Sequence, residues 1–344
     1  MTTTNTRVLF KEAPEGWVET KHMEVSKVDF NPDTVQLDVG DVVLKVLYLS
    51  LDPYMRGRMR VGGKSYSEPF KLGEVLHAGG VAEVYRVGGS AAKFQKGDIV
   101  QGMVGWEQWT VARKGQLDGF QKVEVVEGVP LSYYLGVLGM PGMTAYMGLL
   151  KICQPKAGET VYVSGAAGAV GLVVGQIAKI LGCRVVGSAG TDEKVDLLKE
   201  YGFDAAFNYK TETDFIKALE KYCPDGIDCY FDNVGGEMLD AVLKVANRHA
   251  RFAGCGQISQ YNAVEPYGVK NLMQMVAQRI LFEGFIVGDY MSSRADFVRD
   301  VTKWVKEGKI KYTEHVVEGI EKAPEMFVKL FEGVNIGKLI IKVA

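Results

Sequence analysis

The sequence predicts an α/β protein with two domains, one rich in short β-strands and one built on a doubly wound parallel sheet. Three observations support this prediction. The chain has 344 residues, which is long for a single hydrophobic core. Near residue 130, short β-like runs give way to alternating strand and helix patterns. A glycine-rich turn from Ser164 to Gly171 stands between a predicted strand and a predicted helix.

The first 130 residues contain short β-like runs separated by Gly and Pro. The clearest runs are Val42 to Leu51, Gly80 to Val87 and Asp98 to Ala112. Many short strands with turn signals between them are typical of a small barrel or sandwich. The tail returns to this pattern at Lys338 to Val343, so we expect it to rejoin the first domain. The predicted domains are residues 1–130 with 305–344, and residues 131–304.

From Leu131 onward, strands alternate with helices, which is typical of a parallel sheet with helices on both faces. The predicted strands are Thr160–Val163, Arg184–Ser188, Ala205–Asn208, Ile227–Phe231, Arg251–Cys255 and Ile280–Val287. The predicted helices are the one after Gly171, Glu193–Tyr201, Thr213–Tyr222 and Met238–Ala246.

The turn from Ser164 to Gly171 has the spacing Gly-x-x-Gly-x-x-Gly, a variant of the dinucleotide-binding pattern. Such a turn lets the backbone approach a pyrophosphate, and the helix that follows presents unpaired N–H groups to its charge. Small residues also allow plain packing of a helix on a strand. The strand before the turn and the apolar helix from Leu172 to Leu181 favour the dinucleotide interpretation.

The end of the second predicted strand bears on the choice between NAD and NADP. NAD-binding units usually place an acid there, whereas this tip reads Gly187-Ser188-Ala189-Gly190. The absence of an acid permits a 2′-phosphate, which Lys194 and Tyr209 could contact; the alternative is that both are ordinary surface residues. Asp192 and Glu193 complicate this interpretation, although after Thr191 they resemble the capped first turn of a helix.

Composition excludes several classes of protein. The formal net charge of −2 gives no electrostatic reason to expect a nucleic-acid or membrane partner. The N-terminus has no apolar signal segment and no apolar run is long enough to span a bilayer, so we expect a cytoplasmic protein. The five cysteines give neither a disulfide framework nor a four-cysteine zinc site, and we expect them to be reduced, buried thiols.

A catalytic metal is not expected. Glu74 and His77 are three residues apart, but no cysteine precedes them and the chain has only four histidines. A zinc shell of the Cys/His type is therefore hard to assemble. Without zinc, a substrate carbonyl must be polarised by hydrogen bonds. Hydride addition to a conjugated C=C bond is then easier than direct reduction of a ketone, because the charge spreads to the oxygen.

Several longer strings resemble a known family. They are Leu49 to Arg56, Pro130 to Tyr134, Gly139 to Tyr146, Asp232 to Gly236, Cys255 to Asn262 and Asn335 to Lys338. Over essentially the whole chain the sequence resembles the zinc-free medium-chain dehydrogenase/reductase superfamily. It is most similar to the plant NADPH-dependent alkenal double-bond reductases, which are related to prostaglandin reductases. The resemblance implies a GroES-like β-rich domain, a Rossmann domain and a homodimer built by edge strands.

The resemblance also implies a set of NADPH-binding residues and no metal ligands. Residues Gly165 to Gly171 would hold the pyrophosphate, and Gly190, Lys194 and Tyr209 the 2′-phosphate. The implied cofactor residues are Pro53, Tyr54, Gly165, Ala166, Ala167, Gly168, Ala169, Val170, Gly171, Gly190, Lys194, Tyr209, Asn233, Cys255, Tyr261, Phe285, Ile286, Val287 and Asn335. Tyr54 and Tyr261 would also contact the substrate. The Gly-rich segment from Val61 to Tyr66 is shorter than in many relatives, so substrate range transfers least.

The expected reaction delivers hydride from NADPH to the β-carbon of an α,β-unsaturated aldehyde or ketone. Tyr261 would stabilise the developing enolate, with Tyr54 or the nicotinamide ribose as further donors. The α-carbon would take its proton from water or through Tyr261. The alternative is that both tyrosines are pocket walls held by packing.

Three rival functions remain at this point. A zinc-free quinone reductase would share the nucleotide domain, but the strings at Asp52 to Arg56 and Ser259 to Asn262 favour the alkenal branch. An inactive NADPH-binding structural or regulatory protein is disfavoured because the glycines, Asn233 and Tyr261 are all present. A zinc alcohol dehydrogenase would require stoichiometric metal. The physiological substrate among aromatic enals, aliphatic alkenals and cyclic enones stays open.

Overall fold

The computed structural model describes residues 3–89 and 93–344, which divide into two compact units. The first unit contains Met1–Leu135, Glu314–Asn335 and Leu339–Ala344. The second contains Gly136–Thr313 and the short strip Ile336–Lys338. The chain crosses between the units after Leu135 and after Thr313, five and nine residues later than the predicted boundaries at 130 and 304. The strip Ile336–Lys338 belongs with the second unit, whereas the sequence prediction placed the whole tail in the first.

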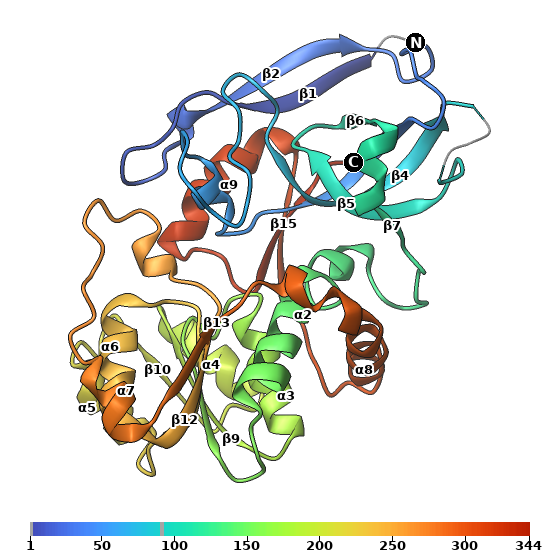
Figure 1. Cartoon of the computed structure of the whole chain (residues 1–344). Helices are drawn as coiled ribbons and strands as arrows, with labels where there is room; N and C mark the ends of the chain where they lie inside the picture. The colour runs from blue at the N-terminus through green and yellow to red at the C-terminus, as the bar shows by residue number, and fades with distance from the viewer. Residues whose placement is uncertain (1–2, 90–92) are drawn as a thin grey trace. The chain divides into compact units, whose positions relative to one another are not determined.

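The first unit is β-rich (Figure 1). A hairpin is formed by β1 (Thr3–Phe10) and β2 (Met23–Phe30). The larger sheet has the order β14-β15-β3-β4-β5-β7, with β6 also paired to β3. Its strands are β3 (Val42–Ser50), β4 (His77–Val87), β5 (Ile99–Gly105), β6 (Trp109–Ala112), β7 (Gln121–Lys122), β14 (Glu314–Glu318) and β15 (Lys338–Lys342). The helices are α1 (Met55–Arg58) and α9 (Ala323–Glu332).

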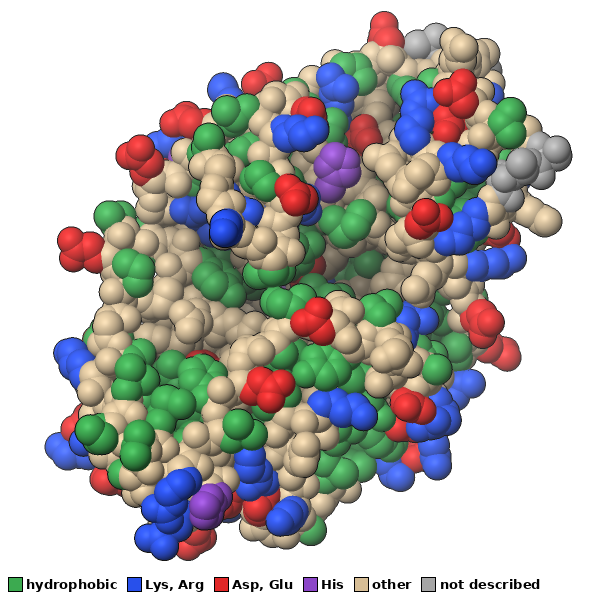
Figure 2. All heavy atoms as spheres, in the orientation of Figure 1, with side chains coloured by type: hydrophobic (Ala, Val, Ile, Leu, Met, Phe, Trp, Pro, Cys, Tyr) green, Lys and Arg blue, Asp and Glu red, His purple; other side chains and the backbone are tan. Residues whose placement is uncertain are grey.

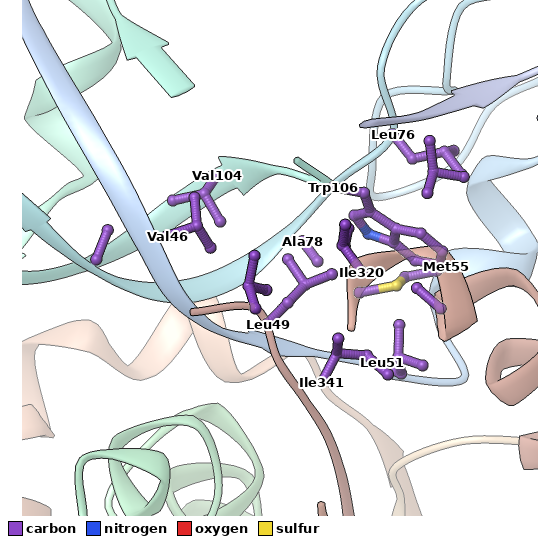
Figure 3. Close-up of a cluster of buried hydrophobic side chains, with 14 of the residues drawn as sticks. Val46, Leu49, Leu51, Met55, Leu76, Ala78, Val104, Trp106, Ile320 and Ile341 are labelled. Carbon is purple, nitrogen blue, oxygen red and sulfur yellow. The ribbon is translucent and has the colours of Figure 1, made fainter. Parts of the chain in front are cut away.

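The core of the first unit lies between the strands and α9. Figure 3 shows Leu76, Ala78 and Met55 near Trp106, which is 1% exposed and belongs to the same buried cluster as the apolar side chains of β3, β4 and β5. The Trp106 ring meets the ring of Phe327 on α9 edge to face, with centroids 5.7 Å apart. Burial of such large rings contributes on the order of a few kcal/mol each to folding. The tail therefore packs into the first unit's core through α9 and β15.

The second unit is a six-stranded sheet with the order β10-β9-β8-β11-β12-β13, and every pairing in it is parallel. The strands are β8 (Thr160–Val163), β9 (Arg184–Ala189), β10 (Ala205–Asn208), β11 (Ile227–Asp232), β12 (Ala246–Gly254) and β13 (Leu281–Gly284). The order reverses at β8, where the chain steps to β9 on one side and β11 lies on the other. The predicted doubly wound fold is confirmed, and its topological switch point lies at β8, where ligands bind in such folds.

Helices cover both faces of this sheet (Figure 1). The helices are α2 (Met140–Met147), α3 (Gly171–Ile180), α4 (Asp192–Glu200), α5 (Phe215–Tyr222), α6 (Gly236–Val245), α7 (Met273–Gln278) and α8 (Arg294–Lys306). Aromatic side chains of the strands stack beneath α5 and α6. The ring centroid of Tyr162 lies 6.1 Å from that of Phe207 and 5.4 Å from that of Tyr230. These flat contacts fill the interior between sheet and helices.

The structure departs from the sequence prediction in several elements. Strand β12 begins at Ala246, five residues before the predicted Arg251, and it contains His249 at φ +64°. This irregular start, with the register shift opposite β11, hides the strand from a pattern of uniform apolar residues. The predicted run from Asp98 to Ala112 is two strands, β5 and β6. Helices α7, α8 and α9 were not predicted. No helix in residues 3–89 and 93–344 is long and apolar enough to cross a membrane.

Candidate active site

The glycine-rich turn joins β8 to α3, as predicted. Gly165 has a φ of +59°, which glycine adopts without steric strain. The Ala166 N–H donates a hydrogen bond of 2.9 Å to the carbonyl oxygen of Ser188, which joins the turn to the end of β9. The first N–H groups of α3 bond to the turn itself, since the Leu172 N–H donates to the Gly168 carbonyl oxygen at 3.0 Å and the Val173 N–H to the Val170 carbonyl oxygen at 3.1 Å.

The last two glycines of the motif differ in what surrounds them. A methyl group placed on Gly171 would lie 2.6 Å from both Ala166 Cα and the Gly165 carbonyl oxygen, so this position must be glycine for the turn to close. A methyl group on Gly168 would meet only the Gly165 carbonyl oxygen, at 3.3 Å, and would otherwise stand in open space. The turn therefore fits a pyrophosphate that approaches the backbone at Gly168.

A buried hydrogen-bond network links the turn to the end of β11. The Asn233 amide Nδ2 donates to the Ser164 carbonyl oxygen at 2.8 Å, and the Asn233 N–H donates to Ser164 Oγ at 3.1 Å. Asp232 Oδ1 accepts from Tyr230 Oη at 2.6 Å and from Ser164 Oγ at 3.2 Å. These bonds orient the Asn233 side chain toward the glycine turn.

Asp232 is 1% exposed and holds the loop that follows β11. Its Oδ1 also accepts the N–H groups of Val234 at 2.9 Å and Gly235 at 2.8 Å. Its Oδ2 is buried and has no hydrogen-bond partner among the described residues. Burial raises the pKa of this carboxyl, and the hydrogen bonds to Oδ1 only partly oppose that rise.

The structure brings the three predicted 2′-phosphate residues together at the end of β9. A methyl group on Gly190 would lie 2.8 Å from Tyr209 Oη, so the tyrosine hydroxyl lies directly over this glycine. Thr191 caps α4, and its Oγ1 accepts the Lys194 N–H at 3.3 Å. The Lys194 side chain is only 8% exposed, and its burial lowers the pKa of the ammonium group.

The first turn of α4 contains two acids, Asp192 and Glu193, and Asp192 is hydrogen-bonded to the neighbouring strand. Asp192 Oδ1 accepts a hydrogen bond of 2.8 Å from Asn208 Nδ2, at the end of β10. The Asn208 Oδ1 in turn accepts the Lys210 N–H at 3.0 Å. Asp192 therefore has a hydrogen-bond partner at the end of the neighbouring strand.

Tyr261 follows a short 3₁₀ turn, Ile258–Gln260, after β12. Its hydroxyl oxygen accepts the Gln257 N–H at 3.1 Å, and a methyl group on Gly256 would lie 2.8 Å from that oxygen. The Ile258 N–H donates to the Asn233 carbonyl oxygen at 3.2 Å. Tyr261 thus belongs to a loop that is hydrogen-bonded to Asn233, which is itself bonded to the glycine turn.

The ends of β12 and β13 carry the remaining predicted residues of this unit. Cys255 is half-buried rather than buried, and its N–H donates to the Asp232 carbonyl oxygen at 2.9 Å. Burial raises the pKa of the Cys255 thiol to about 12. The Phe285 N–H donates to the Gly254 carbonyl oxygen at 3.3 Å, so Phe285 to Val287 leave the sheet beside Cys255.

The C-terminal strip Ile336–Lys338 reaches the glycine turn. The Gly337 N–H donates to the Ala167 carbonyl oxygen at 3.0 Å, and the strip pairs with Gly168 in a parallel bridge. Asn335 directly precedes this strip in the chain. Asn335, Pro53 and Tyr54 belong to the first unit, and their assignment to the cofactor stays a prediction.

His77 lies at the start of β4, half-buried. Burial lowers the pKa of its imidazole, and the charge of Arg58 lowers it further. In the described parts of the chain, no group of three or more His, Cys, Asp or Glu side chains is arranged to hold a metal ion.

Sequence reasoning did not assign roles to Ser164, Asp232, Lys210 or Gly337. Asp232 had a visible signal, because it ends an apolar strand with a carboxylate. The sequence signal of Gly337 was weaker, because it is only a glycine just before an apolar strand. The other two are recognisable only when β8, β9 and β10 are placed side by side.

The chain is similar to known proteins along nearly its whole length. Residues 169–307 match the family described as zinc-binding dehydrogenase, and residues 6–122 match the N-terminal domain of oxidoreductase. The chain is 50% identical to 2-alkenal reductase (NADP(+)-dependent) of Nicotiana tabacum, covering 99% of this chain and 98% of the relative. It is 44% identical to prostaglandin reductase 1 of Sus scrofa, covering 95% of each.

A solved structure is similar over the whole chain. CurA in complex with NADPH from Vibrio vulnificus matches with a TM-score of 0.89 and 41% identity, covering 98% of this chain and 99% of that one. Identity at this level over the full length of both chains shows common family membership. The chain belongs to the medium-chain dehydrogenase/reductase superfamily, in the group that includes 2-alkenal reductase and prostaglandin reductase 1.

Proposed function

We propose that this protein is an NADPH-dependent reductase of the C=C bond of α,β-unsaturated aldehydes and ketones. The observation that carries the proposal is one continuous set of hydrogen bonds at the carboxyl ends of β8, β11 and β12. It runs from the glycine turn through Ser164 and Asn233 to the loop of Tyr261. A dinucleotide site and a hydroxyl donor are thereby joined in one loop cluster. Full-length relationship to a 2-alkenal reductase supports the same reaction.

The residues present fit NADPH. The turn leaves space at Gly168 for a pyrophosphate, and β9 ends without the acid of NAD-binding units, followed by α4 with Lys194 and covered at Gly190 by Tyr209. Bound NADPH supplies the hydride that adds to the β-carbon of the substrate. In this proposal Asn233, hydrogen-bonded to Ser164, binds the cofactor's ribose, and the backbone of Phe285 to Val287 binds its carboxamide.

Tyr261 is the proposed donor to the substrate oxygen. Its hydroxyl oxygen accepts the Gln257 N–H, and a tyrosine hydroxyl can donate a hydrogen bond as well as accept one. A hydroxyl that accepts one hydrogen bond is a stronger donor in the next, because the bonds polarise each other. Donation to the oxygen stabilises the enolate that forms as hydride reaches the β-carbon. The α-carbon then takes a proton from water or through Tyr261.

The test is steady-state kinetics with NADPH and NADH against a matched panel of enals, enones and simple quinones. We expect turnover of enals and enones with NADPH, with product analysis showing a saturated carbonyl and no alcohol. Faster turnover of quinones than of every enal would instead assign a quinone reductase. NADPH binding without turnover across the panel would assign a protein that has lost catalysis.

We also propose that the protein forms a homodimer through β13. Within the described residues β13 pairs only with β12, so its outer edge offers unpaired N–H and C=O groups. Exposed apolar side chains lie beside this edge, and Figure 2 shows hydrophobic side chains gathered over α7. Their exposed fractions are 52% for Leu281, 53% for Leu272, 72% for Met273 and 72% for Val276. The edge of β13 in one chain can pair with the same edge in a second chain across a two-fold axis. Such a symmetric pairing uses both edges and stops at a dimer.

Light scattering after size-exclusion chromatography tests the dimer. We expect about twice the chain mass of 37.8 kDa for the wild type and a shift to the monomer for the double variant Met273→Asp with Leu281→Lys. Val39→Lys, at a 66% exposed apolar position of the first unit, is the matched control and should stay dimeric. A wild-type monomer at micromolar concentration would refute the proposal.

We propose a cytoplasmic location because the cysteines form no disulfides. All five are free in the structure, as proteins of a reducing compartment keep them. Fractionation of the source cells with an antibody against the protein tests this location.

A further inference from the structure

Lys210 lies at the proposed 2′-phosphate site, although neither the motif nor the resemblance includes it. A methyl group on Gly190 would lie 3.4 Å from Lys210 Cε as well as 2.8 Å from Tyr209 Oη. The end of the lysine side chain therefore passes over the same glycine that the tyrosine hydroxyl covers. The end of β9 is lined by two consecutive residues from the turn after β10.

The main chain at Tyr209 and Lys210 is held by hydrogen bonds, and the Lys210 side chain is exposed. Its N–H donates to Asn208 Oδ1 at 3.0 Å, and the Tyr209 N–H donates to the Ala189 carbonyl oxygen at 3.0 Å. In residues 3–89 and 93–344, no carboxylate lies within ion-pair distance of its ammonium group. Asn208 also engages Asp192, the acid on the adjacent helix, through its amide Nδ2.

Lys194 and Lys210 place two positive charges near one another. The charge of Lys210 adds to burial in lowering the pKa of Lys194, and Glu193 opposes them only as a smaller influence. Like charges brought together, one of them on a largely buried side chain, raise the energy of the protein without a ligand. An anion between them removes this cost, which is the electrostatic arrangement of a phosphate site.

We propose that Lys210 is a specificity-determining residue for the cofactor, whose ammonium group pairs with the 2′-phosphate of NADPH together with Lys194 and Tyr209. This inference rests on the proposed function, because it presumes that NADPH occupies the turn. NADH carries a hydroxyl in place of that phosphate, so the contribution of Lys210 falls on one cofactor alone. Lysine suits this place because its ammonium acts as a point charge on a flexible stem that follows the phosphate.

The test compares ligands that differ only in the 2′-phosphate. Dissociation constants of NADPH, NADH, 2′,5′-ADP and 5′-AMP are measured by calorimetry for the wild type, Lys210→Gln and Lys210→Arg. Lys210→Gln removes one charge-assisted contact, so the dissociation constants of NADPH and 2′,5′-ADP should rise about 5- to 30-fold. NADH and 5′-AMP should bind unchanged. Lys210→Arg should retain most of the preference, because it keeps the charge.

Lys199→Gln is the matched control, since Lys199 lies exposed on α4 and pairs with Asp196 at 3.0 Å. It should leave all four dissociation constants unchanged. Equal weakening of NADPH and NADH by Lys210→Gln would assign a structural role and overturn the inference, as would no weakening of either. If the wild type itself binds 2′,5′-ADP no tighter than 5′-AMP, the cofactor assignment fails. A wild-type preference that survives in Lys210→Gln overturns the role of Lys210 alone.

Discussion

The backbone N–H of Gly337 donates a hydrogen bond of 3.0 Å to the carbonyl oxygen of Ala167, in the middle of the glycine-rich turn. Gly337 has a φ of +66°, and the next residue, Lys338, donates its N–H to the Thr313 carbonyl oxygen at 3.0 Å. The proposed pyrophosphate turn is thus braced by a segment 170 residues later in the chain. The state of this strip should affect cofactor binding directly.

Gly337→Ala is expected to destabilise the protein strongly. A methyl group there would lie 2.0 Å from the Thr313 carbonyl oxygen, and the positive φ disfavours any side chain. The left-handed backbone alone costs about 1–2 kcal/mol, and the clash should bring the total to about 3 kcal/mol or more. Denaturant unfolding followed by fluorescence measures the loss.

Gly308→Ala is the matched control for that variant. Gly308 has nearly the same φ, +67°, but a methyl group there meets no atom within 4 Å. Gly308→Ala should lower the free energy of unfolding only by the cost of the left-handed backbone, about 1–2 kcal/mol. Equal losses in the two variants would show that the contact with Thr313 is readily relieved.

Two glycines of the turn should respond differently to alanine. Gly171→Ala places a methyl group 2.6 Å from Ala166 Cα, so it should lower the free energy of unfolding even without cofactor. Gly168→Ala meets one oxygen at 3.3 Å and should leave that free energy within about 1 kcal/mol of the wild type. Its methyl group occupies the space for the pyrophosphate, so NADPH affinity should fall at least about tenfold. Normal NADPH affinity in Gly168→Ala would move the phosphate site elsewhere.

The parallel sheet could be predicted from the sequence because its strands are short apolar runs between helical patterns. Strands β8 and β10 were predicted to the residue, since buried parallel strands carry uninterrupted apolar side chains. The start of β12 was missed because Asn247 and His249 interrupt the apolar pattern there. Helix α8 is amphipathic but mostly charged, and its two buried residues, Phe297 and Val301, give a thin signal.

The residues of the candidate site likewise include some that the sequence predicts and some that it does not. Residues within contiguous strings, such as Gly165 to Gly171, could be found from spacing and resemblance. Asp232 and Lys210 acquire their roles from neighbours on other strands, which a linear pattern does not contain. The half-burial of Cys255 depends on the loops around it in the same manner.

The stability of the wild type relative to Asp232→Asn should depend on pH. Burial raises the folded-state pKa of Asp232 above its unfolded value, so the folded state binds the proton more tightly. The stability contributed by this proton is present at low pH and is lost as pH rises through the folded-state pKa. Asparagine keeps an oxygen acceptor and cannot ionise. The free energy of unfolding of Asp232→Asn should therefore improve relative to the wild type from about pH 4 to about pH 7. A difference that is constant over this range would mean that the carboxyl titrates normally.

Tyr261→Phe should slow the reduction of enals without weakening the cofactor. Removing one donor to a developing oxyanion lowers kcat by roughly tenfold to a thousandfold. NADPH affinity should stay near the wild-type value, which separates loss of donation from collapse of the loop. Tyr267→Phe is the control, because it removes a tyrosine hydroxyl that donates to Asp240 Oδ2 at 3.0 Å, outside the proposed site. Unchanged kcat in Tyr261→Phe would leave this tyrosine as a pocket wall.

The cysteines should resist alkylation by the enals that the enzyme reduces. Enals add to thiolates, and burial raises the pKa of Cys183 to about 11 and of Cys223 to about 12. At neutral pH the thiolate fraction of such groups is on the order of 10⁻⁴ or less, so addition is slow. Intact mass spectrometry after incubation with acrolein, without NADPH, should show few adducts on the native protein and several in denaturant. Val264→Cys, at an 83% exposed position, should gain one adduct rapidly. Native wild-type protein that is alkylated as fast as the denatured chain would show that these thiols are open to solvent.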